Sequence, residues 1–171
     1  MEFVVGTHAH LLSVNVSDNW ELQNVEVLNV GHHYGVALLD RENPICFTAR
    51  GPGGTTLSDY ERRVSSDGES SYNKIESRSL QGEASRLEWG SVHQIAFCNK
   101  GLYLANTQSN SLVYLSEQGD KSVYYFEDTN SDRNHINSVF PNEDGQVVAL
   151  LHNKGRENSE IAILEHSENG F

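Results

Sequence analysis

Basic residues, prolines, cysteines and long apolar runs are all scarce in this sequence. Lys and Arg number 12 against 24 Asp and Glu, so the formal net charge is −12. Nucleic acids and anionic membrane surfaces bind clustered positive charge, and we therefore expect neither as a partner. No stretch approaches the roughly 20 apolar residues of a membrane-spanning helix. The start, MEFVVGTHAH, lacks the basic and apolar regions of a signal peptide, so we expect a cytoplasmic protein.

The two cysteines, Cys46 and Cys98, each lie within an apolar run. Their positions allow a disulfide but do not require one, and we predict two buried thiols. Only 3 prolines and 37% hydrophobic residues in a chain of 171 indicate a globular protein with enough length for one good core or for a few repeats.

Residues 92–128 carry the most regular pattern in the sequence. Four runs of about six residues rich in branched and aromatic side chains are separated by the turn clusters NKG, TQSN and EQGD; the runs are VHQIAFC, LYLAN, SLVYLS and KSVYYFED. This pattern is typical of an antiparallel meander. A four-stranded sheet cannot bury both of its faces alone, so we predict an all-β fold, a β-propeller of four-stranded antiparallel blades.

Similar runs occur on both sides of this stretch. We predict strands at 2–5, 10–16, 20–30, 33–40, 45–50, 72–80, 135–140, 146–152 and 160–165. The segment between the fifth and sixth of these, GPGGTTLSDYERRVSSDGESS at 51–71, is rich in Gly and Ser and has no sustained period. We interpret it as a long loop with room for one short strand.

Three segments align on a histidine that precedes an apolar strand: GHHYGVALLD, SVHQIAFCNK and NHINSVFPNE. His93 and His135 are 42 positions apart, while His33 and His93 are 60 apart. Removal of the Gly/Ser-rich loop brings the longer spacing close to the shorter one, and a period of about 40 to 45 residues is typical of propeller blades. Coincidence is the alternative, but the strand order after each histidine also repeats.

We therefore interpret the chain as one partial propeller of about three blades. Its parts are outer strands completing a neighbouring blade (1–31), a blade with the loop 51–71 (32–88), a second blade (89–130) and an incomplete blade (131–171). Three blades cannot close into a ring, since single-chain propellers have about four to eight, and open sheet edges invite pairing. We expect a homodimer that forms a six-bladed ring head to tail. The alternative is a fragment of a longer propeller.

Two stretches resemble known propeller blades. GSVHQIAFCNKGLYLANTQSNSLVYLS and DRNHINSVFPNEDGQVVALL are similar to blades of the NHL and SMP-30 (gluconolactonase-like) superfamily, and more so to an uncharacterised bacterial propeller family. The resemblance covers roughly residues 90–155 and implies a six-bladed propeller, although this chain is about half that length. It also implies that channel histidines could hold a metal ion, as in some lyases and amidating enzymes. The acidic ligands of calcium-dependent lactonases have no counterpart at the inner-strand starts.

In a propeller the innermost strands begin beside the channel at the top face. The loops between second and third strands open on the same face. We therefore predict these ligand-binding residues: His33, Arg50, His93, Asn106, His135, His152 and Arg156.

Two functions fit this set of residues. The first is a propeller that binds a small molecule, glycan or protein at its top face. The second is a metal-dependent hydrolase or lyase in which His33, His93 and His135 hold zinc or calcium. The absence of a local H-E-x-x-H signature or an evident acid–base pair favours binding, and we assign no catalytic residue and no certain cofactor.

Overall fold

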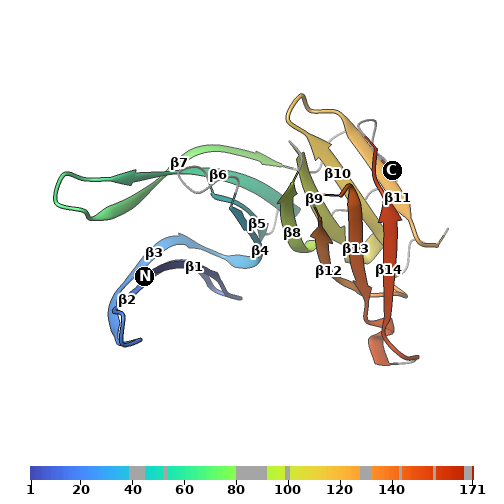
Figure 1. Cartoon of the computed structure of the whole chain (residues 1–171), viewed down its shortest axis with the longest axis horizontal. Coiled ribbons are helices and arrows are strands. Elements are labelled where there is room, and N and C mark those ends of the chain that lie inside the picture. The colour runs from blue at the N-terminus through green and yellow to red at the C-terminus, as the bar shows by residue number, and fades with distance from the viewer. Residues whose placement is uncertain are drawn as a thin grey trace. The chain divides into compact units, whose positions relative to one another are not determined.

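The computed structural model describes residues 1–38, 45–51, 54–79, 92–98, 101–127, 132–142, 144–155, 157–167 and 171; at 45–51, 54–55 and 77–79 it describes the backbone alone. These residues form antiparallel strands and two short 3-10 helices, arranged as two four-stranded and two three-stranded sheets (Figure 1). The predicted all-β, blade-like architecture is confirmed. Contacts divide the chain into unit 1, Met1–Ser79, and unit 2, Leu80–Phe171.

Unit 1 contains one sheet of each size. Strands β1 (Glu2–Gly6), β2 (His10–Val16) and β3 (Leu22–Val30) form a three-stranded sheet in that order. Strands β4 (His32–Leu38), β5 (Ile45–Gly51), β6 (Gly54–Val64) and β7 (Ser70–Ser79) form a four-stranded sheet. The strands at 1–31 thus pair with one another, and their proposed completion of another blade stays a prediction.

The prediction of a long loop at 51–71 is wrong. Strand β6 covers Gly54–Val64 and pairs with β5 on one side and β7 on the other. Leu57 and Tyr60 are 1% and 3% exposed, so this strand supplies core residues despite its many small polar neighbours. Pairing on both edges satisfies its backbone, which composition alone does not reveal. In the described part of this segment, the residues between β6 and β7 form a short turn around Gly68, which has a φ of +86°.

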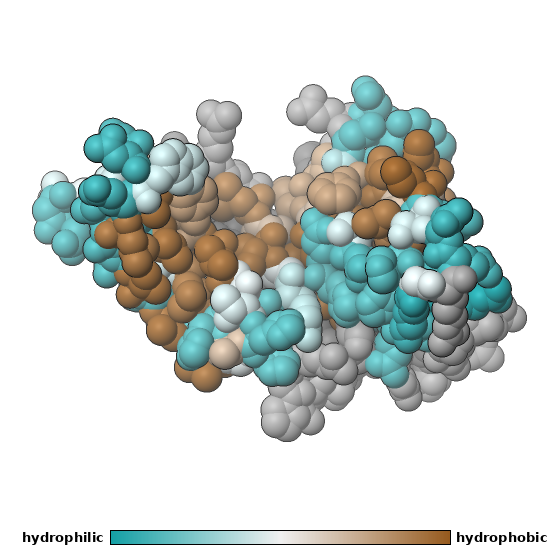
Figure 2. Space-filling model, turned by 90° about the horizontal axis from the view of Figure 1, so that it is seen from below, coloured by the Kyte–Doolittle hydropathy of each residue, from teal (hydrophilic) through white to brown (hydrophobic). Residues whose placement is uncertain are grey.

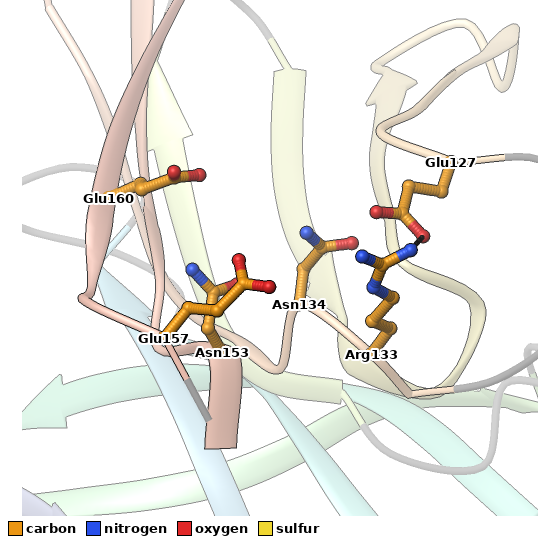
Figure 3. A pocket seen from close by; sticks show the side chains of 6 residues that line it. All are labelled: Glu127, Arg133, Asn134, Asn153, Glu157 and Glu160. Carbon is orange, nitrogen blue, oxygen red and sulfur yellow. Dashed lines mark hydrogen bonds and ion pairs between the residues drawn. The ribbon is translucent and has the colours of Figure 1, made fainter. Parts of the chain in front are cut away.

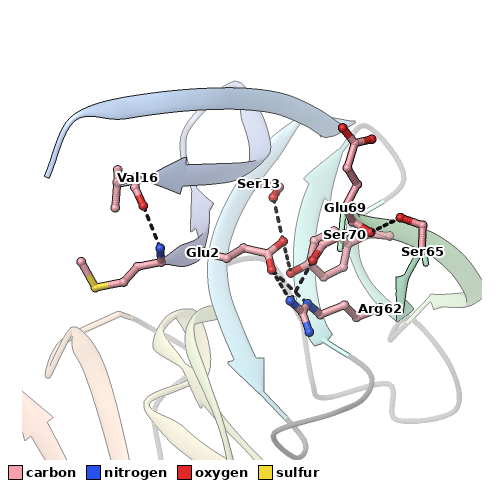
Figure 4. A network of polar contacts seen from close by, with 9 residues as sticks. Glu2, Ser13, Val16, Arg62, Ser65, Glu69 and Ser70 are labelled. Atoms are coloured by element: carbon pink, nitrogen blue, oxygen red, sulfur yellow. Dashed lines mark hydrogen bonds and ion pairs between the residues drawn. The ribbon is translucent and has the colours of Figure 1, made fainter. Parts of the chain in front are cut away.

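A polar network joins the two sheets of unit 1. Arg62 of β6 donates to the Glu2 carboxylate of β1 from Nη2 at 2.6 Å and from Nε at 3.0 Å. The Tyr72 hydroxyl and the Ser13 hydroxyl donate to the other carboxylate oxygen at 2.9 and 3.3 Å (Figure 4). Asn29 of β3 also donates to the Tyr60 hydroxyl at 2.8 Å. The polar face of the β1–β3 sheet is therefore turned toward the β4–β7 sheet.

Unit 2 repeats the arrangement in the opposite order. Strands β8 (Val92–Cys98), β9 (Gly101–Asn106), β10 (Ser111–Ser116) and β11 (Lys121–Tyr125) form the four-stranded sheet predicted for 92–128. Strands β12 (Ile136–Pro141), β13 (Gln146–Leu151) and β14 (Glu160–Glu165) form a three-stranded sheet. The helices η1 (Thr107–Ser109) and η2 (Asn153–Gly155) follow β9 and β13.

The core of unit 2 lies between these two sheets. Tyr103 and Tyr114 of the first sheet meet Val139, Val147 and Ala149 of the second. Tyr103 and Tyr114 are 1% and 8% exposed. By contrast, Tyr124 and Tyr125 of β11 are 38% and 46% exposed.

The predicted burial of both cysteines is tested at one position. Cys98 is a free, half-buried thiol whose Sγ donates to the backbone oxygen of Asn142 at 3.6 Å. The Cys46 side chain lies outside the described residues. In the described parts of the chain, no helix has the length and apolar character needed to cross a bilayer.

In both units the turn after one strand accepts a hydrogen bond from the backbone at the beginning of a later strand or just before it. In unit 1 the backbone oxygen of Thr7, after β1, accepts from the His33 amide at 2.9 Å. In unit 2 the side chain of Asn110, after β9, accepts from the amides of Arg133 and Asn134 at 3.0 and 2.9 Å. By this contact β1, β2, β3 and β4 correspond to β9, β10, β11 and β12.

Candidate functional site

Asn110 fixes one end of unit 2. It is fully buried and has a left-handed backbone, with φ of 46°, which Asn tolerates better than most residues. Its backbone oxygen accepts from the Phe126 amide at 2.9 Å, and its side chain holds the segment before β12. The Thr107 hydroxyl donates to the backbone oxygen of Ile136 at 2.6 Å. The turn after β9, the end of β11 and the start of β12 are thereby brought to a single end of the unit.

His135 occupies a constrained position in this region. Its backbone φ is 48°, and its Nδ1 lies 2.9 and 3.0 Å from the two carboxylate oxygens of Asp132. Lys154 Nζ forms an ion pair with the same carboxylate at 2.7 Å. Burial would raise the pKa of Asp132, but hydrogen bonds from Lys154 and His135 outweigh it and lower that pKa. Asp132 therefore stays a carboxylate and fixes the orientation of the imidazole.

Two further histidines lie beside His135. The His93 ring meets it edge to face with ring centroids 5.0 Å apart, and His93 Nδ1 lies 2.9 Å from the Asn137 amide oxygen. The ring centroid of His152 lies 5.8 Å from that of His135, and the His152 side chain is exposed. Three of the residues predicted at the top face are thus gathered within unit 2.

A small polar pocket of about 100 Å³ opens at the same end of the unit (Figure 3). It is lined by Glu127, Arg133, Asn134, Asn153, Glu157 and Glu160. Arg133 Nη1 pairs with Glu127 at 3.3 Å, whereas Glu157 and Glu160 form no ion pair with any described residue. The buried Oδ1 of Asn134 has no hydrogen-bond partner among the described residues. The lining is therefore rich in acceptors and net negative.

The helix η2 and its flanks shape one wall of this pocket. Asn153 has φ of 55° and Lys154 has φ of 51°, so the chain turns sharply after β13. The Asn153 amide donates to the backbone oxygen of Asn134 at 2.8 Å, and its side-chain Nδ2 donates to the backbone oxygen of Asn158, also at 2.8 Å. These bonds hold the pocket residues in place without a ligand.

Other predicted residues do not belong to this group. His33 belongs to unit 1 and is only 2% exposed. Asn106 is fully buried at the end of β9, where its Nδ2 donates to the Ser111 hydroxyl at 3.3 Å. Arg50 lies in β5 opposite His32 and Thr55, but its side chain, like all of Arg156, lies outside the described residues. In the described part of the chain, no three His, Cys, Asp or Glu side chains are placed to hold a metal ion.

Most of the pocket lining was not predicted from the sequence. Glu127, Arg133, Asn134, Glu157 and Glu160 look like ordinary turn residues in a strongly acidic chain. One available signal was their position, because all five flank strand ends on the same side of the predicted blades. That position, rather than residue type, was the evidence that could have identified them.

Comparisons with known proteins identify the fold. No family model and no curated protein matches the chain. Among solved structures, a chain of a nidogen/laminin complex matches with a TM-score of 0.63 at 13% identity, covering 96% of this chain and 57% of that one. A hydrazine synthase chain from Kuenenia stuttgartiensis gives 0.58 at 13%, covering 92% and 40%. Virginiamycin B lyase from Staphylococcus aureus, solved as an inactive H270A variant with quinupristin, gives 0.51 at 12%, covering 98% and 56%.

The chain therefore has the fold of the β-propellers, as the blade pattern and the resemblance to NHL-type blades predicted. It spans between 40% and 57% of the length of these three matching chains. At identities of 12 to 13% the likeness establishes the fold alone.

Proposed function

We propose that the chain is a binding module whose polar pocket in unit 2 receives a basic side chain of a protein or peptide partner. The observation that carries this proposal is the excess of acceptor oxygens and negative charge in the lining of the pocket. Asn134 presents a buried amide oxygen without a partner among the described residues. The carboxylates of Glu157 and Glu160 line the same pocket, and neither forms an ion pair within the described part of the chain. A guanidinium or ammonium group supplies donors to these acceptors and a positive charge to balance the two carboxylates.

The size of the pocket agrees with this class of ligand. Sites for whole small molecules usually measure about 300 to 1,000 Å³, and this pocket is about 100 Å³. That space suits the head of one Lys or Arg side chain, with the rest of the partner lying on the surface around it. The formal net charge of −12 favours approach of a basic partner over the whole surface.

Titration with Nα-acetyl-arginine N-methylamide, followed by NMR of the Asn134 and Asn153 side-chain amides, tests the proposal. We expect saturable shifts at these amides, and weaker binding of the neutral citrulline counterpart. Glu157→Gln should weaken binding of the arginine probe by about tenfold, the loss of one charge-assisted hydrogen bond. Glu76→Gln removes the same charge from an exposed position on β7 and should have no effect. Equal binding of arginine and citrulline probes would contradict the proposal.

A second candidate function is acid–base catalysis by His135. Asp132 holds its Nδ1 through two short contacts, and a carboxylate that orients an imidazole leaves the other ring nitrogen available as a general base. Virginiamycin B lyase shares the fold, so quinupristin is a reasonable first probe. If His135 is a catalytic base for this probe, chromatography of the native chain incubated with quinupristin should show a product peak. The His135→Ala variant should give no such peak. Repeating the assay with a chelator tests the metal dependence predicted from the sequence.

A further inference from the structure

Most apolar side chains of the β1–β3 sheet lie on one face. The register sets Phe3 opposite Val14 and Val14 opposite Val25, and the next such row is formed by Val5, Leu12 and Val27. We call this surface the amino-terminal open face; its most prominent residues are Phe3, Val5, Trp20, Leu22, Val25 and Val27. Apolar atoms gather over this sheet in a continuous area (Figure 2).

The amino-terminal open face is exposed to solvent to an unusual degree. Val25 is 45% exposed, Val27 is 53% exposed and Trp20 is 71% exposed. Trp20 stacks on Phe3 with ring centroids 6.2 Å apart, which extends the surface past the strand ends. A contiguous apolar surface of this kind marks an interaction site on a soluble protein.

The last sheet of unit 2 carries a second such surface. Here the register sets Phe140 opposite Val148 and Val148 opposite Ile163, with Leu150 and Ile161 in the next row. We call these five residues the carboxy-terminal open face. Phe140, Ile161 and Ile163 are 57%, 69% and 62% exposed, whereas the opposite side of the same sheet is buried against β8–β11.

The two open faces correspond to the two opposite sides of a blade. The β1–β3 sheet packs its polar face on the sheet that follows it in the chain, so its open face is the one that a preceding blade would cover. The β12–β14 sheet packs on the sheet that precedes it, so its open face is the one that a following blade would cover. Within unit 2, successive sheets pack through the same kind of apolar contact.

We propose that the carboxy-terminal open face of one copy of this chain docks on the amino-terminal open face of a second copy. This is a heterologous contact, in which two different surfaces of the same protein meet. The occupant is a second copy because this chain itself presents both members of the pair. Two copies also bring the number of sheets from four into the upper part of the range of about four to eight blades found in propellers.

Sedimentation velocity over a range of protein concentrations tests the contact with three variants. Val25→Asp alters the amino-terminal open face, and Ile163→Asp alters the carboxy-terminal one. Ile75→Asp is the matched control, since Ile75 is 60% exposed on β7 and belongs to neither face. The native chain and the control should associate. Each of the other two variants should associate at least about 100-fold more weakly, because docking would bury an unpaired charge.

The decisive measurement is a mixture of the two interface variants. The Val25→Asp copy retains an intact carboxy-terminal open face, and the Ile163→Asp copy retains an intact amino-terminal one. The mixture should therefore recover 1:1 dimers, although each variant alone remains monomeric. Circular dichroism verifies that every variant is folded. A native chain that stays monomeric at high concentration, or association that only Val25→Asp disrupts, would overturn the proposal.

Discussion

His33 is a buried imidazole in unit 1, where an exposed site residue was expected. Its side chain is only 2% exposed, and burial, together with the charges of His10 and His32, lowers its pKa from 6.5. The sequence could not reveal this burial. A histidine at the start of an apolar strand can point toward a shared site, as His93 does beside His135, or pack into the core of its own unit. The pattern of a histidine followed by an apolar run therefore locates the strand, but it does not tell whether the histidine side chain is exposed.

The lowered pKa of His33 predicts a loss of stability in mild acid. The unfolded chain binds the proton near pH 6.5, before the folded chain does. The contribution of His33 to stability is thus complete above that pH and falls as the pH drops toward the lowered pKa. Urea unfolding at pH 7.5 and 5.5 should show a smaller pH effect in His33→Gln than in the native chain. Exposed His8 provides the control, and an equal pH effect in His33→Gln would refute the prediction.

The Glu2–Arg62 contact gives a second prediction for single residues. Burial would raise the pKa of Glu2, but hydrogen bonds from Arg62 and Tyr72 outweigh it and lower that pKa from 4.5. Glu2→Gln should cost about 1 to 2 kcal/mol at pH 7. The cost should shrink as the pH falls through the lowered pKa, since the native carboxylate then takes up a proton. Denaturant unfolding of Glu2→Gln and the native chain, at pH 7 and at an acidic pH, measures this difference in cost.

An exposed ion pair on β6, the strand that carries Arg62, controls for the loss of a glutamate charge alone. Glu61 and Arg63 form an exposed ion pair at 2.8 Å, and exposed pairs contribute little. Glu61→Gln should therefore change the free energy of unfolding by less than about 0.5 kcal/mol. If both glutamate variants cost the same, the Glu2 network has no special role in joining the two sheets.

At the scale of strands, the hairpin β9–β10 depends on close approach at Gly101. A Cβ atom at this position would overlap the ring of Tyr114 on the neighbouring strand, and Tyr114 belongs to the buried core. Gly101→Ala should destabilise the protein by about 1 to 3 kcal/mol through overpacking. Thermal unfolding should show a smaller effect of the same change in a Tyr114→Leu background. An equal effect in both backgrounds would show that the ring is not the cause.

The strands themselves were largely predictable from the sequence, whereas β6 was not. In β8 to β10, runs rich in branched and aromatic residues are bounded by clusters of turn-forming residues, so local pattern and final structure agree. In β6 the apolar positions Leu57 and Tyr60 are separated by a register shift between Asp59 and Tyr60, which breaks the two-residue period. Gly and Ser around them then indicated a loop. Pairing of β6 with β5 and with β7 makes this segment a strand, and that pairing is not visible in the local sequence.

At the scale of the whole molecule, charge and apolar surface act against each other. Each copy carries a formal charge of −12, so two copies repel at long range, while the proposed contact is apolar. Raising NaCl from about 0.05 to about 0.5 M shortens the Debye length from roughly 14 to roughly 4 Å and should strengthen self-association. Sedimentation at both salt concentrations measures the change. Weaker association at high salt would indicate that ion pairs, rather than the open faces, join the copies.

The candidate site was predictable only in part, for reasons of geometry. His93, His135 and His152 come together because equivalent strand ends meet at one end of stacked sheets, which the repeat itself implies. The pocket beside them depends on the left-handed turns at Asn110 and Asn153 and on which carboxylates those turns expose. Those backbone angles are set by hydrogen bonds between distant loops, and the sequence gives no local sign of them.

The contact by which a turn holds the start of the next inner strand has a further consequence for how such proteins arise. Because Thr7 with His33 and Asn110 with Asn134 make this contact at equivalent places in the two units, a gene segment running from one inner strand to the next encodes one blade together with its junction. Its duplication or deletion would lengthen or shorten the protein by one blade and leave every remaining junction intact. Variation in blade number among relatives is then expected to occur in whole modules.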